Sequence, residues 1–263
     1  MGAFKGDTGN AVNVANYELF NTTTASLGVK YNPANGALAV AEMKKDEPVA
    51  KDAVEAVAKP KDNYDKAVAE RNNVEDTLND TVRGVFSDLM TNPKITVETK
   101  NKLTTLGDLI SGNNVKQHSR EKAKQAPPTT PGTPNPTPDT SSHAHSVSQQ
   151  SHTKRSANFT DFVSLVENTP DYVTNEPLAK PAALRKKADL LKSLNKQVDD
   201  LYIPYSDAMK QRDLALYHPV TGICSKARLA KYYVSKSPAF SAREKKMIAA
   251  IKFTVPSDED LHF

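Results

Sequence analysis

Tryptophan is absent from this 263-residue chain, cysteine occurs once, and aromatic residues make up only 6% of the sequence. The single cysteine, Cys224, excludes an internal disulfide framework. No run approaches about 18 consecutive apolar residues, which excludes an ordinary transmembrane helix. Residues 1–30 contain no cationic start followed by an apolar run, so no secretory leader is expected. We therefore expect a cytoplasmic protein, with export by a route that needs no leader as the alternative.

The remaining composition is lean but compatible with a folded protein. Hydrophobic residues make up 38% of the chain, and the mean hydropathy is −0.58. With so few aromatic residues, the cores must be built from Ala, Val, Leu and Ile. The length allows two domains of ordinary size. Strand patterns are scarce and helical periodicity is common, so the sequence predicts an all-α fold.

The strongest pattern in the sequence is an internal repeat. Three short motifs occur once in each half, in the same order, with offsets of about 141 to 145 residues. Such a repeat is large enough to be a domain, which favours the duplication of a helical module. The motifs are Ala15-Asn16-Tyr17-x-x-Phe20 with Ala157-Asn158-Phe159-x-x-Phe162, Tyr64-x-x-Ala67-x-x-x-Arg71 with Tyr205-x-x-Ala208-x-x-x-Arg212, and Asn92-Pro93-x-x-Thr96-x-x-x-Lys100 with Ser237-Pro238-x-x-Ser241-x-x-x-Lys245.

Composition divides the chain into two repeats and a linker. We predict a helical repeat at 1–115, a polar linker rich in Pro, Thr, Ser and His at 116–152, and a second helical repeat at 153–263. The prolines of the linker favour an extended spacer that cannot bury a core. The two repeats can fold as separate bundles or merge into one elongated bundle, and the sequence does not choose between these.

Helix boundaries carry clear local signals. Ser241 and Glu244 form a capping-box pattern, and Thr96 can cap the equivalent helix of the first repeat. Pro204 interrupts an apolar helical stripe that runs from about 184 to 209, so we expect a kink or a short break there. Pro60 predicts a similar bend in the first repeat.

Residues that could carry chemistry do not converge. His143, His145 and His152 lack cysteine partners and fall in a polar segment, so we interpret them as a flexible tail. Cys224 has no histidine placed by a recognisable motif and is interpreted as an inert thiol. There is no phosphate-binding glycine loop and no Glu-x-x-His pair. The sequence therefore predicts a protein that is not an enzyme, with no cofactor, no metal and no evident small-molecule ligand.

The repeated tyrosine and arginine residues need a separate explanation. Tyr64 and Arg71, like Tyr205 and Arg212, lie on one helical face. The arginine could reach a carboxylate or a loop carbonyl while the tyrosine packs. We favour this structural role over ligand binding, because the motif follows the packing stripe.

Charge differs sharply between the two halves. Residues 1–112 contain 13 Lys and Arg against 16 Asp and Glu, whereas residues 157–263 contain 16 against 13. A basic stretch in the second repeat is a candidate patch for assembly or anion binding. Its residues are Lys226, Arg228, Lys231, Arg243, Lys245 and Lys246.

Two functions are compatible with this charge pattern. In the first, the acidic repeat of one molecule docks on the basic repeat of the next, and this head-to-tail contact propagates as a filament. In the second, the basic repeat binds a polyanion, either nucleic acid or an anionic membrane surface. We favour a structural protein that assembles with itself.

Short motifs also indicate a resemblance. Tyr31-Asn32-Pro33, Ser146-Val147-Ser148-Gln149 and Asn175-Glu176-Pro177 stand near the element boundaries. In this the chain resembles a set of internally duplicated all-helical proteins of Bacteroidota whose function is unknown. The resemblance implies a paired helical-bundle fold and supplies no catalytic residues.

Overall fold

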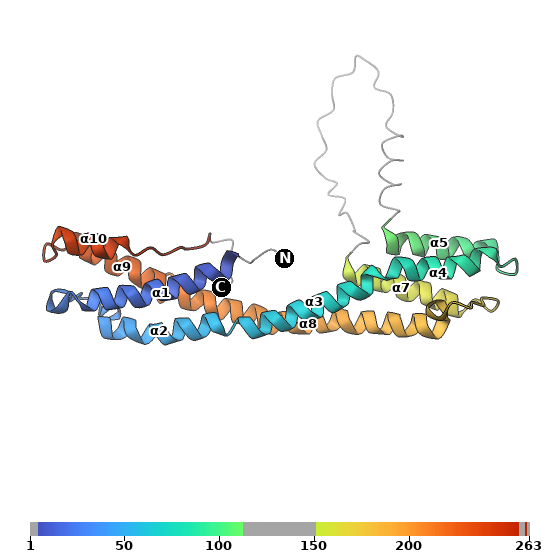
Figure 1. Cartoon of the computed structure of the whole chain (residues 1–263), viewed down its shortest axis with the longest axis horizontal. Helices are drawn as coiled ribbons and strands as arrows, with labels where there is room; N and C mark the ends of the chain where they lie inside the picture. Colours follow the sequence, from blue (N-terminus) through green and yellow to red (C-terminus); the bar gives the residue numbers. More distant parts are fainter. Residues whose placement is uncertain (1–4, 113–150, 258–260, 262–263) are drawn as a thin grey trace, which may run out of the picture. The chain divides into compact units, whose positions relative to one another are not determined.

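The computed structural model describes residues 5–112, 151–257 and 261. Every regular element in these ranges is a helix (Figure 1), which confirms the predicted all-α class. Of the predicted linker at 116–152, residues 116–150, with His143 and His145, lie outside the described residues. The α-helices are α1 (Lys5–Ala25), α2 (Val40–Glu55), α3 (Ala58–Asp76), α4 (Leu78–Thr91), α5 (Val97–Ser111), α7 (His152–Glu167), α8 (Pro181–Tyr217), α9 (Ile223–Lys236) and α10 (Ala242–Ala250), and the 3-10 helices are η1 (Gly28–Lys30), η2 (Gly36–Leu38) and η3 (Pro177–Ala179).

The helices pack into two compact units, and each unit draws on both halves of the sequence. Within the described residues, unit 1 is built from 1–66 and 199–263, and unit 2 from 67–198. The boundaries between the units fall inside α3 and α8. Neither predicted repeat therefore forms a compact unit by itself. Instead, the first half of each repeat packs with the second half of the other.

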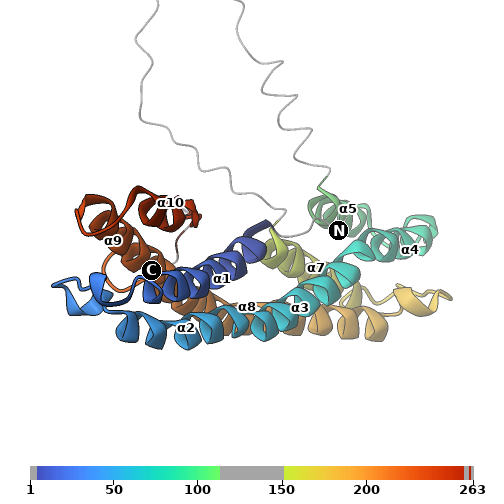
Figure 2. The ribbon, with the colours of Figure 1, turned by 60° about the vertical axis from the view of Figure 1, so that its left-hand side comes forward.

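Unit 1 is organised around α1. This helix packs against α2 and α9, and α9 packs against α10 (Figures 1 and 2). Tyr17, Phe20 and Met43 come from the first repeat and are fully buried, as is Leu216 from the second. Because these side chains share one apolar cluster, the unit 1 core depends on both repeats.

Unit 2 is organised around α5. Helix α5 packs against α7 and α4, and Phe159 and Phe162 of α7 are fully buried. Phe86 of α4 meets Phe162 edge to face, with ring centroids 5.9 Å apart. Gly107 of α5 allows this approach, since a Cβ there would lie 2.7 Å from the Phe86 ring. The unit 2 core therefore also combines both repeats.

The two repeats share a loop-closing hydrogen bond. Tyr31 Oη donates to the carbonyl oxygen of Leu38 at 2.9 Å, and Tyr172 Oη donates to the carbonyl oxygen of Ala179 at 3.1 Å. Donors and acceptors are each 141 residues apart in the sequence. In both places the bond ties the loop that follows the first helix to the short 3-10 turn that precedes the second.

The predicted helix caps are present. Ser241 accepts a hydrogen bond from the Glu244 amide, and the Glu244 carboxylate accepts one from the Ser241 amide, which completes the capping box. Thr96 caps α5 by accepting from the amide of Thr99. Local sequence therefore determines where these two helices begin.

The structure has no helix break at Pro204, and it places the break of the first repeat just before Pro60. Helix α8 continues through Pro204 without the break that the sequence predicted as one outcome. Packing on both sides of Pro204 holds the helix, with Val198 and Met209 buried. In the first repeat the chain breaks at residues 56–57, so that Pro60 falls in the first turn of α3, where proline is tolerated.

Candidate functional site

The predicted basic patch does not form a single open surface. Lys226 is an internal partner, because its Nζ donates to Asp46 Oδ2 of α2 at 2.7 Å. Arg228 and Lys231 lie on α9 and border a cavity. On α10, Arg243 and Lys246 are exposed, and Lys245 is partly buried. The six predicted cations are therefore divided among an internal ion pair, the wall of a cavity and the surface of α10.

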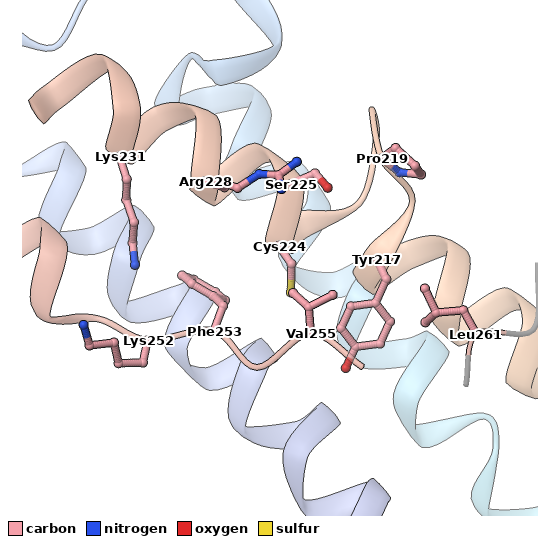
Figure 3. Close-up of a pocket in the computed structure, with 10 residues that line it drawn as sticks. All are labelled: Tyr217, Pro219, Cys224, Ser225, Arg228, Lys231, Lys252, Phe253, Val255 and Leu261. Atoms are coloured by element: carbon pink, nitrogen blue, oxygen red, sulfur yellow. The ribbon is translucent and has the colours of Figure 1, made fainter. Parts of the chain in front are cut away.

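A cavity lies along α9 in unit 1 (Figure 3). Its volume is about 620 Å³, within the range of roughly 300 to 1,000 Å³ that is typical of small-molecule sites. The walls come from the end of α8, from α9 and from the extended segment 252–255 that follows α10. Every part of this wall belongs to unit 1.

Three cations line the cavity, and none of its lining residues in the described part of the chain carries a carboxylate. Arg228 and Lys231 come from α9 and Lys252 from the extended segment. Lys231 extends toward that segment (Figure 3), donates to the carbonyl oxygen of Ile251, and lies 4.9 Å from the centroid of the Phe253 ring. Burial lowers the pKa of Lys231, and the positive charge of Lys252 lowers it further. The site is therefore electropositive.

The rest of the wall is apolar or neutral. Phe253, Val255 and Leu261 contribute aliphatic and aromatic surface, together with the ring of Tyr217. Cys224 points toward Val255 (Figure 3) and is 5% exposed. Burial raises the pKa of Cys224 to about 12, so the thiol is neutral at pH 7. The thiol is buried, as an inert cysteine would be.

Asparagine side chains of α1 fix the segment that closes the cavity. Asn13 Nδ2 donates to the carbonyl oxygen of Thr254 at 2.6 Å, and the Thr254 amide donates to Asn13 Oδ1 at 2.9 Å. Asn16 Nδ2 donates to the carbonyl oxygen of Lys252 at 2.7 Å. Tyr217 Oη donates to Asn10 Oδ1 at 2.5 Å. Helix α1 therefore holds segment 252–255 in place.

The repeated tyrosines meet each other. Tyr64 of α3 stacks on Tyr205 of α8, with ring centroids 5.5 Å apart and an interplanar angle of 25°. Arg71 Nε donates to Asn72 Oδ1 at 3.4 Å, and Arg212 Nε donates to Asp213 Oδ1 at 2.8 Å. Each arginine thus bonds the residue that follows it, at sites 141 residues apart. Both motifs serve contacts within the protein.

A buried carboxylate connects the two repeats in unit 2. Glu75 of α3 is 3% exposed and accepts from Arg155 Nη1 of α7 at 3.2 Å. His152 Nδ1 lies 2.8 Å from Glu75 Oε2, and Arg155 Nε also donates to the carbonyl oxygen of Ile110. His152, which we interpreted as part of a flexible tail, is the first residue of α7 and an ion-pair partner. Its partner, Glu75, lies 77 residues away in the sequence, so local spacing does not indicate this contact.

Several residues of the cavity were not predicted from the sequence. Phe253 and Val255 follow the last helix in a short segment without periodicity. The asparagine that holds this segment, Asn13, is 241 residues away from Thr254. The repeated Ala-Asn-aromatic motif contains Asn16, which gave the only local signal for this contact.

Within the described ranges, no group of three or more His, Cys, Asp or Glu side chains could hold a metal ion. Among the same residues, no helix combines the length and apolar character needed to cross a bilayer. No family model, no curated protein and no solved structure matches the chain. The resemblance to duplicated helical proteins of Bacteroidota stays a prediction.

Proposed function

We propose that the protein is a non-enzymatic structural component that assembles with itself. In this assembly, the first repeat of one molecule pairs with the second repeat of the next. The observation that carries the proposal is the composition of the two compact units, each of which needs segments from both repeats. The surface of a repeat that packs on the other repeat of its own chain can pack in the same way on that repeat in another chain, as in domain swapping. A head-to-tail contact of this kind propagates as an open polymer.

The proposal includes an origin by duplication of one helical module. Equivalent hydrogen bonds at Tyr31 and Tyr172 support it, since both close the same kind of loop. The stacking of Tyr64 on Tyr205 supports it as well. In a two-fold symmetric pair of identical modules, a residue near the axis meets its own equivalent. The pairing of the two repeats has this property.

Charge complementarity favours pairing between unlike repeats. Lys226 of the second repeat binds Asp46 of the first at 2.7 Å, and Lys30 of the first lies 3.2 Å from Glu244 of the second. The Lys226–Asp46 pair follows the contrast between a basic second repeat and an acidic first repeat, whereas the Lys30–Glu244 pair has the opposite polarity. The same ion pairs would form between two chains, so they support the register of the proposed assembly.

The length of the linker allows the two repeats to pair either within one chain or between two chains. Residues 113–150 connect α5 to α7, although these helices pack together and Arg155 Nε lies 3.2 Å from the carbonyl oxygen of Ile110. A loop of about 8 residues is enough for neighbouring antiparallel helices. The additional length costs little closure entropy, and it allows the second repeat to reach another molecule.

The test compares the natural chain with a variant whose residues 113–150 are replaced by an 8-residue Gly-Ser loop. Both are refolded from urea over a range of protein concentrations up to about 1 mM, near the expected effective concentration of pairing within the chain. The shorter loop raises that effective concentration about tenfold. We therefore expect polymers in the natural chain at about tenfold lower concentration than in the variant.

Sedimentation velocity and electron microscopy give the readout. High salt should weaken the assembly, since part of its specificity comes from ion pairs. A natural chain that stays monomeric after refolding at the highest concentration, at both low and high salt, would contradict the proposal.

A second candidate function is polyanion binding by the basic surface of the second repeat. The specific observation in its favour is that Arg228, Arg243 and Lys246 are exposed and form no ion pair with the described residues. Titration with DNA and with anionic vesicles tests it. Charge reversal at Lys245 and Lys246 should abolish this binding, whereas assembly through the repeat surfaces should survive the change.

A further inference from the structure

The cavity of unit 1 has the features of a ligand site and plays no part in the proposed assembly. Its volume of about 620 Å³ exceeds what a few ordered water molecules need. Its lining combines three cations with apolar side chains. The hydrogen bonds that hold segment 252–255 on α1 do not fill this space.

The cations restrict the charge of a ligand. Arg228 and Lys252 have no carboxylate partner among the described residues, and Lys231 bonds only a backbone carbonyl group and a ring face. Burial is the larger cause of the lowered pKa of Lys231, and repulsion by the charge of Lys252 adds to it. A bound anion would relieve this repulsion and would accept charge-assisted hydrogen bonds from the guanidinium and ammonium groups.

The apolar wall restricts the rest of the ligand. Phe253, Val255 and Leu261 would contact an aliphatic or aromatic body of moderate length. A small inorganic anion would leave this surface in contact with water, and a neutral lipid would leave the cations unpaired. The site therefore suits a molecule that has one anionic head and an apolar body.

The site is also preformed. Asn13 and Asn16 of α1 hold the backbone at Lys252 and Thr254, so the segment that carries Lys252, Phe253 and Val255 does not have to order on binding. A fixed wall lowers the entropic cost of binding.

We propose that this cavity, lined by Arg228, Lys231, Lys252 and Phe253, binds a small amphipathic carboxylate. The carboxylate lies against the three cations, and the hydrocarbon body lies on Phe253, Val255 and Leu261.

Isothermal titration calorimetry of the full-length protein with decanoate tests the inference, with 1-decanol as the uncharged comparison. We expect decanoate to bind at one site, at least tenfold more tightly than decanol. Replacing both Arg228 and Lys252 by glutamine should weaken decanoate binding at least tenfold and leave decanol binding nearly unchanged. The matched control is the double replacement of Arg243 and Lys246 by glutamine on α10, which should bind decanoate as the natural protein does.

A second variant tests the cavity without removing charge. Val255→Trp fills the space above Cys224 and should abolish decanoate binding while the helical circular dichroism spectrum is retained. Equal affinities for decanoate and decanol would overturn the proposal, as would unchanged binding by the variant that lacks Arg228 and Lys252.

The chain itself contains another anion that the test must distinguish. Asp258, Glu259 and Asp260 directly precede Leu261 in the sequence. A variant with Asn, Gln and Asn at these positions should bind decanoate with the affinity of the natural protein. Binding by this variant alone would overturn the proposal, because the natural occupant would then be the chain's own acidic segment.

Discussion

Cutting the linker tests the cross-paired architecture directly. We consider a variant with a protease site inserted between Pro131 and Gly132, which is cleaved after folding. Because each compact unit contains segments from both sides of the cut, the two fragments should stay together as one 1:1 complex. Their apolar clusters, which include Phe20 with Leu216 in unit 1 and Leu89 with Phe162 in unit 2, hold the fragments together.

The magnitude of the effect follows from the change in molecularity. An intact linker gives an effective concentration of about 1 mM. At about 10 µM protein, cleavage lowers the concentration at which one fragment meets the other about a hundredfold. This corresponds to a loss of about 2.7 kcal/mol in the free energy of unfolding. For a protein of this size the loss lowers Tm by about 5 to 10 °C. The Tm of the cleaved protein should also fall on dilution, whereas that of the intact protein should not.

Size-exclusion chromatography with light scattering gives the mass of the cleaved species, and thermal unfolding at several concentrations gives the Tm series. The uncleaved protein with the same insertion is the control. Two separately eluting fragments that each retain a helical spectrum would refute the reasoning, because each repeat would then fold by itself.

Three further predictions concern single residues and pH. Glu75→Gln should lower the free energy of unfolding by about 2 to 3 kcal/mol, measured by urea denaturation, because it leaves Arg155 without its buried carboxylate. Gly222→Ala should cost about 1 to 3 kcal/mol, since its Cβ would lie 2.5 Å from the backbone nitrogen of His218. Stability should fall as the pH rises from about 9 to 12. Burial raises the pKa of both Cys224 and Tyr217 to about 12, so the unfolded chain loses these protons first.

Each of these predictions has a matched control. Glu70→Gln changes an exposed carboxylate on the same helix and should be nearly neutral. Gly36→Ala adds a Cβ with no atom within 4 Å and should also be nearly neutral. Cys224→Ala should remove part of the alkaline loss. Equal effects in a variant and its control, or urea midpoints that do not change above pH 9, would contradict the corresponding prediction.

Much of the local structure could be predicted from the sequence, because the signals for it are local. The capping box at Ser241 and the cap at Thr96 depend on residues within one helical turn. The apolar stripe of α8 is buried at Leu184, Leu191 and Val198 as its spacing predicts. These features determined the fold class and several helix ends.

The pairing of the helices could not be predicted, and the repeat itself is the reason. When two copies have similar apolar faces, the apolar pattern of a helix is compatible with a partner helix from its own copy and with one from the other copy. The contacts that distinguish these arrangements are far apart in the sequence, such as Lys226 with Asp46, 180 residues away. The cavity on α9 was missed for the same reason, because its closing segment is held by Asn13 of α1.

Charge supplies the discrimination that apolar pattern lacks. Under the proposed duplication, identical modules would pair as readily with themselves as with each other. Pairing of the second copy with itself is disfavoured, because Lys226 would then meet Lys187 and Glu244 would meet Asp171, the residues 141 positions after Asp46 and Lys30. The charge difference therefore selects unlike pairing without selecting whether the two copies belong to one chain or to two. That choice is left to the length of the linker and to protein concentration, which are the two variables that the refolding experiment changes.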